Sequence, residues 1–159
     1  MVLNSIGLEV NAAKDLANDL NNLLGNFQVY YQNLRGIHWN IKGKRFFDLH
    51  SKFEELYDDA NIKVDEIAER ILTLGETPLH TFEDYLETVK IPVGRDIYHD
   101  EKAVKLIVDS LSGLLKIERK LLEKSAEVDD EGTNSMMSDF ITEQEKTVWM
   151  MKAWLNEKV

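Results

Sequence analysis

Proline is scarce in this chain, and both prolines lie near the middle of the sequence. Pro78 and Pro92 are the only two among 159 residues. Proline disrupts a helix interior, so its absence elsewhere leaves long stretches free to be helical. No stretch alternates apolar and polar residues convincingly with the two-residue period of a half-buried strand. The sequence therefore predicts an all-α fold, with the prolines bracketing a connection between helices.

Four long stretches place apolar residues at every third or fourth position, as a helix with one buried face does. They cover residues 8–39, 48–74, 99–127 and 135–156. Gly75 follows the second stretch, where a C-terminal glycine is common. The polar segment DDEGTN, residues 129–134, is interpreted as the turn before the last helix. Thr81 is expected to begin a short additional helix, with Asp84 as a capping acid three residues later.

The connection between the second and third long helices is itself long, at residues 76–98. A long crossover joins neighbouring helices that run in the same direction, which is typical of ferritin-like four-helix bundles. At 159 residues the chain has the length of one domain. We therefore expect a single ferritin-like domain over residues 1–159, with the short helix inside the crossover.

The composition restricts the chemistry that the chain can perform and the partners that it can bind. The chain has no cysteine, which excludes disulfides, thiol catalysis, zinc–thiolate sites and iron–sulfur clusters. The 19 Lys and Arg residues stand against 29 Asp and Glu residues, for a formal net charge of -10. This charge repels the phosphates of nucleic acids and attracts cations. There is no signal-peptide pattern and no apolar stretch near the roughly 18 residues that span a bilayer, so we expect a cytoplasmic protein.

Five potential metal ligands lie in one segment of the chain. They are His38, His50, Glu54, Asp65 and Glu69, spaced 12, 4, 11 and 4 residues apart. Imidazole and carboxylate groups one helical turn apart can bind a transition metal, and this mixture suits iron or zinc. On a straight helix, the four residues from His50 to Glu69 fall within an arc of about 100°. A solvated acidic face gives the same spacing, so the pattern leaves both interpretations open.

The two pairs of ligands on this helix are too far apart to share one ion. Fifteen residues at about 1.5 Å each separate His50 from Asp65 by about 22 Å, whereas metal–ligand bonds are about 2 Å long. Each pair could recruit other ligands from its own chain. Alternatively, a second copy could pack antiparallel across a two-fold axis near Asp59 and Ala60. The histidine-containing pair of one chain would then face the carboxylate pair of the other, in two identical sites.

The same region resembles a known family. The segments HWNIKG, FFDLHSKFEELYDD and DEIAERILTLGETP are similar to the signature of the Dps family, the DNA-binding proteins from starved cells. The downstream segment EKTVWMMKAWL is similar to the family's last helix. The resemblance spans nearly the whole chain. It implies a miniferritin: a ferritin-like subunit that assembles through two-fold dimers into a hollow dodecameric shell.

The resemblance also implies a site between subunits. Carried over by motif, His38, His50 and Glu54 belong to one subunit of a ferroxidase centre, and Asp65 and Glu69 belong to its partner. Glu54 stands where the family often has aspartate. Other ferritin-like proteins use Glu-x-x-His motifs inside one bundle. No glutamate here has a histidine three residues later, which favours the centre between subunits.

The activity that the resemblance implies is oxidation of Fe²⁺ to Fe³⁺ with hydrogen peroxide as the preferred oxidant. Ferric mineral is then stored in the shell, and removing Fe²⁺ and peroxide together protects against oxidative damage. Iron is the expected metal cofactor and cargo. A non-enzymatic helical assembly module is an alternative, but it leaves the spacing of the five ligands unexplained.

Two further features concern pores and DNA. The family admits iron through acidic three-fold pores, and Asp129, Asp130 and Glu131 lie in that region, although a charged turn also explains them.

Members of the family that bind DNA often use a lysine-rich terminal tail. Here Lys14 is the only Lys or Arg before Arg35, and no basic extension follows the last helix. We therefore expect weak DNA binding, or none, at physiological salt.

Overall fold

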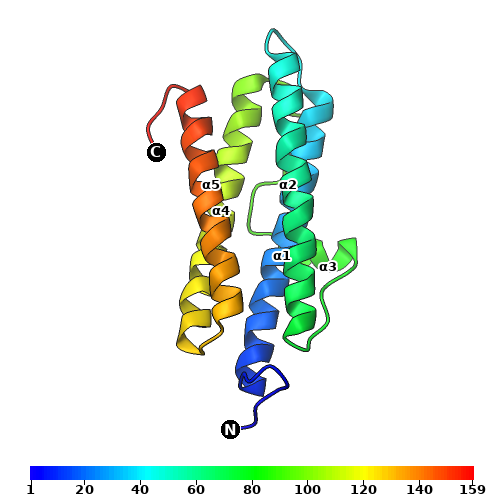
Figure 1. Ribbon diagram of the computed structural model, residues 1–159. Coiled ribbons are helices and arrows are strands. Elements are labelled where there is room, and N and C mark those ends of the chain that lie inside the picture. The colour runs from blue at the N-terminus through cyan, green and yellow to red at the C-terminus, as the bar shows by residue number, and fades with distance from the viewer.

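The computed structural model describes residues 1–159 and contains five helices and no strand. The helices are α1 (Val10–Asn40), α2 (Phe46–Thr73), α3 (Phe82–Glu87), α4 (Asp100–Glu127) and α5 (Glu131–Trp154). The four long helices form an elongated bundle (Figure 1), which confirms the predicted all-α architecture. No helix combines the length and the apolar composition that crossing a membrane requires.

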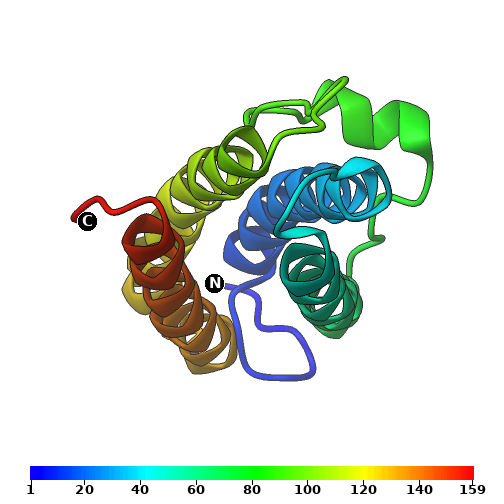
Figure 2. The ribbon, with the colours of Figure 1, turned by 90° about the horizontal axis from the view of Figure 1, so that it is seen from above.

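The long helices pair with their neighbours in the chain. α1 packs antiparallel against α2, and α4 packs antiparallel against α5 (Figure 1). The connection from residue 74 to residue 99 then returns along α1, so that α4 runs in the same direction as α2. Figure 2 shows α3 outside the ring of four helices, beside α1. The expected long crossover with a short helix inside it is therefore confirmed.

The apolar faces predicted from the sequence meet in one continuous core. Its largest fully buried side chains include Phe27 of α1, Phe53 and Ile67 of α2, and Ile107 and Leu114 of α4. Burying one such side chain contributes about 1.5–3 kcal/mol. Packing of these faces therefore supplies most of the stability of the helices, which would be marginal in isolation.

Three asparagines of α1 hold the crossover, and we call them the asparagine clamps. Each side chain donates from Nδ2 to a crossover carbonyl and accepts at Oδ1 from the backbone N–H two residues further on. The bonds join Asn21 to Thr77 O (3.1 Å) and Leu79 N (2.8 Å), Asn26 to Thr88 O (2.9 Å) and Lys90 N (2.8 Å), and Asn33 to Pro92 O (2.7 Å) and Gly94 N (2.9 Å). The clamps thus satisfy backbone groups of an extended segment that has no strand partner.

The observed helix ends correct one prediction and confirm two. α5 begins at Glu131, whereas the sequence suggested Ser135. The reason is Asp130, whose Oδ1 accepts from the backbone N–H of Thr133 at 3.1 Å and caps the helix four residues early. The N-terminal cap of α3 is confirmed at Thr81, and Gly75 ends the second long helix with a φ of 94°.

Candidate metal centre

His38 and His50 form a stacked pair where α1 meets α2. The short connection between these helices places His38 of the last turn of α1 beside His50 of the second turn of α2. Their ring centroids are 3.8 Å apart and the ring planes differ by 12°. His38 is buried, with 7% of its surface exposed, and His50 is half-buried. The structure therefore brings the two predicted imidazole ligands together within one chain.

Backbone contacts determine which nitrogen of each ring is free. Nδ1 of His38 lies 2.6 Å from the carbonyl oxygen of His50, and Nδ1 of His50 lies 2.7 Å from the carbonyl oxygen of His38. A carbonyl oxygen only accepts, so each Nδ1 carries the proton and donates it. Each Nε2 then keeps a lone pair. A backbone bond of this kind orients an imidazole and fixes which of its nitrogens can bind a metal.

Aromatic neighbours further restrict the two rings. Phe46 stacks on His50 at 4.8 Å between centroids, and Tyr57 packs edge-on against His38 at 5.3 Å. The Tyr57 hydroxyl also donates to Oε1 of Glu54 at 3.2 Å. Burial, together with this bond to the carboxylate, raises the pKa of Tyr57. The phenol therefore stays protonated near neutral pH and keeps Glu54 oriented beside the histidine pair.

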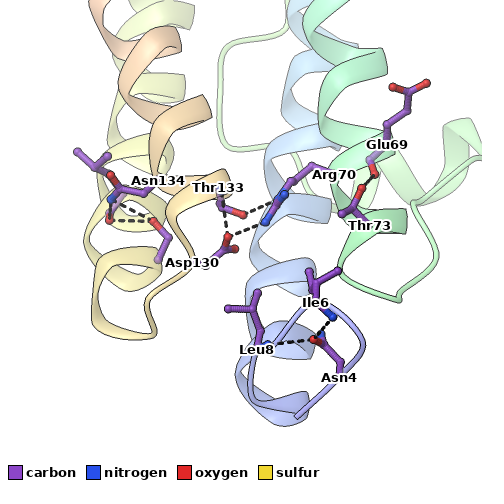
Figure 3. A network of polar contacts seen from close by, with 11 residues as sticks. Asn4, Ile6, Leu8, Glu69, Arg70, Thr73, Asp130, Thr133 and Asn134 are labelled. Carbon is purple, nitrogen blue, oxygen red and sulfur yellow. Dashed lines mark hydrogen bonds and ion pairs between the residues drawn. The ribbon is translucent and has the colours of Figure 1, made fainter.

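The three predicted carboxylate ligands are exposed on α2. Glu54, Asp65 and Glu69 all face solvent in the single chain. Figure 3 shows the Glu69 side chain projecting away from α5, whereas its neighbour Arg70 points toward the start of α5. These carboxylates have no lysine or arginine partner within the chain. They are free to meet a ligand or another surface.

One chain does not assemble all five residues into a site. No group of three or more His, Asp or Glu side chains lies close enough to hold a metal ion. α2 is a continuous helix from Phe46 to Thr73, so His50 and Asp65 remain about 22 Å apart along its axis. The chain thus carries two half-sites: a histidine half-site of His38, His50 and Glu54, and a carboxylate half-site of Asp65 and Glu69.

Large apolar side chains are exposed around the half-sites. Phe47, Ile62 and Leu72 of α2 are 82%, 58% and 58% exposed, and Trp39 at the end of α1 is 57% exposed. At about 100° per residue, Phe47 and Leu72 fall within the arc of the half-sites and Ile62 lies about 20° beyond its edge. Exposed apolar side chains gathered on one face usually indicate a surface that contacts another protein.

The acidic segment before α5 is not a free cluster of carboxylates. Asp130 is buried, and its Oδ1 lies 2.6 Å from Nη2 of Arg70 in addition to capping α5 (Figure 3). The Arg70 Nε also donates to Thr133 Oγ1 at 3.0 Å. Asp130 therefore joins α2 to α5 as a structural residue, whereas Asp129 and Glu131 remain exposed.

Comparison with known proteins identifies the family. A family model described as the ferritin-like domain matches residues 17–158. A DNA protection during starvation protein of Porphyromonas gingivalis is 39% identical over 153 residues, which cover 96% of this chain and 96% of that protein. The chain belongs to the Dps family of ferritin-like proteins.

Solved Dps structures have the same fold. The Dps protein of Vibrio cholerae O1, described as a member of a broad superfamily of ferritin-like diiron-carboxylate proteins, is 52% identical, covers 98% of each chain and gives a TM-score of 0.95. The Dps protein of Bacillus brevis is 33% identical and gives a TM-score of 0.89, over 93% of this chain and 99% of that one. The predicted resemblance to Dps and the ferritin-like bundle are confirmed.

Sequence reasoning missed two residues that shape the histidine half-site of this Dps chain. Tyr57 follows Glu54 by three residues, a spacing that allows contact on a helix, and this could have indicated the hydrogen bond. Phe46 gave no comparable signal, because its position over His50 depends on the turn between α1 and α2.

Proposed function

We propose that this protein stores iron and protects against oxidative damage by oxidising Fe²⁺ with hydrogen peroxide at sites shared by two subunits. The observation that carries the proposal is the reciprocally bonded His38–His50 pair, whose two Nε2 atoms are free while Asp65 and Glu69 remain exposed 15 residues further along the same helix. Membership of a family whose relatives include a ferritin-like diiron-carboxylate protein supports iron as the metal.

A two-fold dimer completes both half-sites. If two α2 helices pack antiparallel around an axis near Asp59 and Ala60, the histidine half-site of each chain faces the carboxylate half-site of the other. The exposed Phe47, Ile62 and Leu72 then become buried in the same interface. The two sites so formed lie about 22 Å apart, since the length of α2 sets their separation.

The two kinds of ligand have different roles in the reaction. The neutral imidazoles bind Fe²⁺ through Nε2 without adding charge, and the carboxylates favour the more highly charged Fe³⁺. Two Fe²⁺ ions each lose one electron, and one hydrogen peroxide accepts both electrons with two protons to give two water molecules. Ferric ions then hydrolyse and deposit as mineral. A net charge of -10 per chain attracts Fe²⁺ toward the protein.

The test is peroxide-driven oxidation of Fe²⁺ added under anaerobic conditions, with the particle mass measured in parallel. The His50→Ala/Asp65→Ala variant should lose rapid oxidation and saturable Fe²⁺ binding, because each site then lacks a ligand from both chains. Glu55→Ala is the matched control, since Glu55 is an exposed carboxylate of α2 that pairs with Lys52. Unchanged oxidation by the double variant would eliminate the proposed site. Absence of saturable Fe²⁺ binding by the wild type would favour a non-enzymatic assembly module.

DNA binding is a second candidate function, because relatives are named for DNA protection. Lys90, Lys116 and Lys120 line a groove between α1 and α4 and have no carboxylate partner. Three lysines per chain stand against a net charge of -10, so we expect binding only at low salt. A gel-shift assay on duplex DNA checks this. A clear shift at about 150 mM salt, abolished by replacing the three lysines, would contradict the expectation.

A further inference from the structure

A groove between α1 and α4 collects four lysines of this acidic chain, and we call it the lysine groove. Lys90 comes from the crossover, whereas Lys116, Lys120 and Lys124 come from α4. Figure 2 shows α1 and α4 side by side, and the two helices are in contact. Asp19 of α1 is the only acidic residue in the lining. The groove therefore concentrates positive charge within a protein whose net charge is -10.

Most of this positive charge is not neutralised inside the chain. The Asp19 carboxylate is already engaged, because its Oδ2 lies 2.6 Å from Nζ of Lys124. The other three lysines of the groove have no carboxylate within ion-pair distance. Elsewhere on the same helix Arg119 does have a partner, Glu145 of α5, at 2.9 Å. Three ammonium groups thus remain available to an anion from outside.

The spacing of the α4 lysines makes them repel one another. Lys116, Lys120 and Lys124 recur at every fourth residue, so they share one face of the helix and are about 6 Å apart along its axis. Like charges at this spacing destabilise a helix. An anion that binds between them removes this repulsion, and its binding should therefore stabilise the folded chain.

The backbone of Lys90 is fixed beside the groove by two separate contacts. Its N–H donates to Oδ1 of Asn26, one of the asparagine clamps, at 2.8 Å. The next residue, Ile91, is buried and packs so closely on α4 that a Cβ added to Gly113 would lie 2.7 Å from its Cγ2. The crossover is thus held against α4 before any ligand binds, which lowers the cost of ordering the site.

The size and the walls of the groove suit a compact ligand. Its volume of about 330 Å³ is at the lower end of the range for small-molecule sites. Half-buried Ile117 and fully buried Leu121 give it apolar walls, and a cleft with such walls and charge of one sign focuses the electric field. Charges beyond about 8 Å are largely screened at physiological ionic strength. An anion inside the groove therefore interacts mainly with the lysines, whereas a DNA duplex also meets the acidic surface around them.

We propose that the lysine groove binds a compact anion that carries two or three linked phosphate groups. Phosphate oxygens accept hydrogen bonds from several ammonium groups at once, and lysine is a common phosphate ligand. The side-chain amide of Asn22, which also lines the groove, supplies a further donor. The phosphate chain can be free or part of a nucleotide, since the lysines recognise the portion that both share. None of the five predicted metal ligands lines this groove, so the inference does not depend on the proposed oxidation of iron.

The test is isothermal titration calorimetry of inorganic triphosphate into the full-length, metal-free protein at low salt. The wild type should bind one triphosphate per subunit. Lys90→Ala/Lys116→Ala/Lys120→Ala should weaken binding by at least about tenfold, because three charged contacts are lost. The three replaced side chains are exposed, so this variant should fold normally, which circular dichroism checks.

A second triple variant controls for net charge. It replaces three exposed lysines that lie outside the groove and have no ion pair, and it should bind triphosphate about as tightly as the wild type. These are Lys44, Lys102 and Lys105, each changed to alanine.

Asp19→Asn should have the opposite effect to the loss of lysines. It removes the one negative charge in the groove and releases Lys124, so triphosphate should bind several-fold more tightly. Asp139→Asn is the matched control, because Asp139 is an exposed carboxylate of α5 without an ion pair, and this variant should bind as the wild type does.

Titration with ATP distinguishes the two sources of the phosphate chain. Tighter binding of ATP than of triphosphate would assign the groove to nucleotides, and binding no tighter would show that the phosphate chain alone is recognised. Three results would overturn the inference: no saturable binding of triphosphate, equal weakening by the two triple variants, or an Asp19→Asn protein that binds no more tightly than the wild type. Duplex DNA that binds through the same lysines where triphosphate does not would overturn it too, by assigning the groove to nucleic acid.

Discussion

Two variants that are each inactive are expected to regain activity when their subunits are mixed. His50→Ala removes a ligand from the histidine half-site, and Asp65→Ala removes one from the carboxylate half-site. In a homodimer of either variant, both sites contain one defect. In a mixed dimer, both defects fall in the same site. The other site receives an unaltered histidine half from one chain and an unaltered carboxylate half from its partner.

The size of the recovery follows from the two-fold geometry. Random pairing of equal amounts makes about half of all dimers mixed, and each mixed dimer has one intact site of two, so about a quarter of all sites are complete. The peroxide-driven Fe²⁺ oxidation rate of the mixture should therefore reach about a quarter of the wild-type rate at equal subunit concentration.

The assay requires that subunits exchange. The two proteins are unfolded together, refolded and checked by native mass spectrometry for mixed particles before the rates are measured. The matched control mixes His38→Ala with His50→Ala, both in the histidine half-site. Each site of a mixed dimer is then still defective, and no recovery is expected. Equal rates for the two mixtures, with mixed particles present, would refute the shared site.

Three further predictions concern stability, measured by chemical unfolding with circular dichroism. Burial of Glu118 inside the bundle raises its pKa to about 7, so the folded state holds a proton that the unfolded chain releases, and stability falls as pH rises toward 7. The free energy of unfolding of Glu118→Gln should therefore exceed that of the wild type by up to about 3 kcal/mol near pH 8 and by little near pH 4. Equal differences at both pH values would contradict this. Asp130→Ala should lower the free energy of unfolding by about 3 kcal/mol, because it removes a helix cap and leaves Arg70 unpaired. A loss below about 1 kcal/mol would mean that the Arg70–Asp130 pair contributes little. Gly25→Ala should lower the free energy of unfolding by about 2 kcal/mol, because the added Cβ would lie 2.0 Å from Thr88 Oγ1. A variant as stable as the wild type would show instead that the crossover moves aside at little cost.

The sequence was sufficient for the helices and their order because those depend on local patterns. Apolar spacing located α1, α2 and α4 to within two residues at each end. α5 was placed too late, because Asp130 was interpreted as part of a turn. The cap itself is a local bond to the backbone N–H of Thr133, three residues later. What no local pattern indicates is the pairing of Asp130 with Arg70, which lies 60 residues earlier in the chain.

The candidate site was only partly predictable. Spacing gave the five ligand positions and the distance between the half-sites. It did not give the stacking of His38 on His50 or the reciprocal backbone bonds, because these depend on how the turn between α1 and α2 closes. The buried Lys63 was also missed. A lysine on an acidic helix suggests an exposed residue, and only packing against α5 shows otherwise.

The asparagine clamps have a consequence for how the protein responds to heat. The crossover is attached to α1 at three separate places and contributes few large side chains to the core, so it can detach one clamp at a time. Amide protons of Leu79, Lys90 and Gly94 should therefore exchange with solvent before those of the helix interiors. The crossover of such a chain can unfold locally while the α1–α2 and α4–α5 hairpins stay folded.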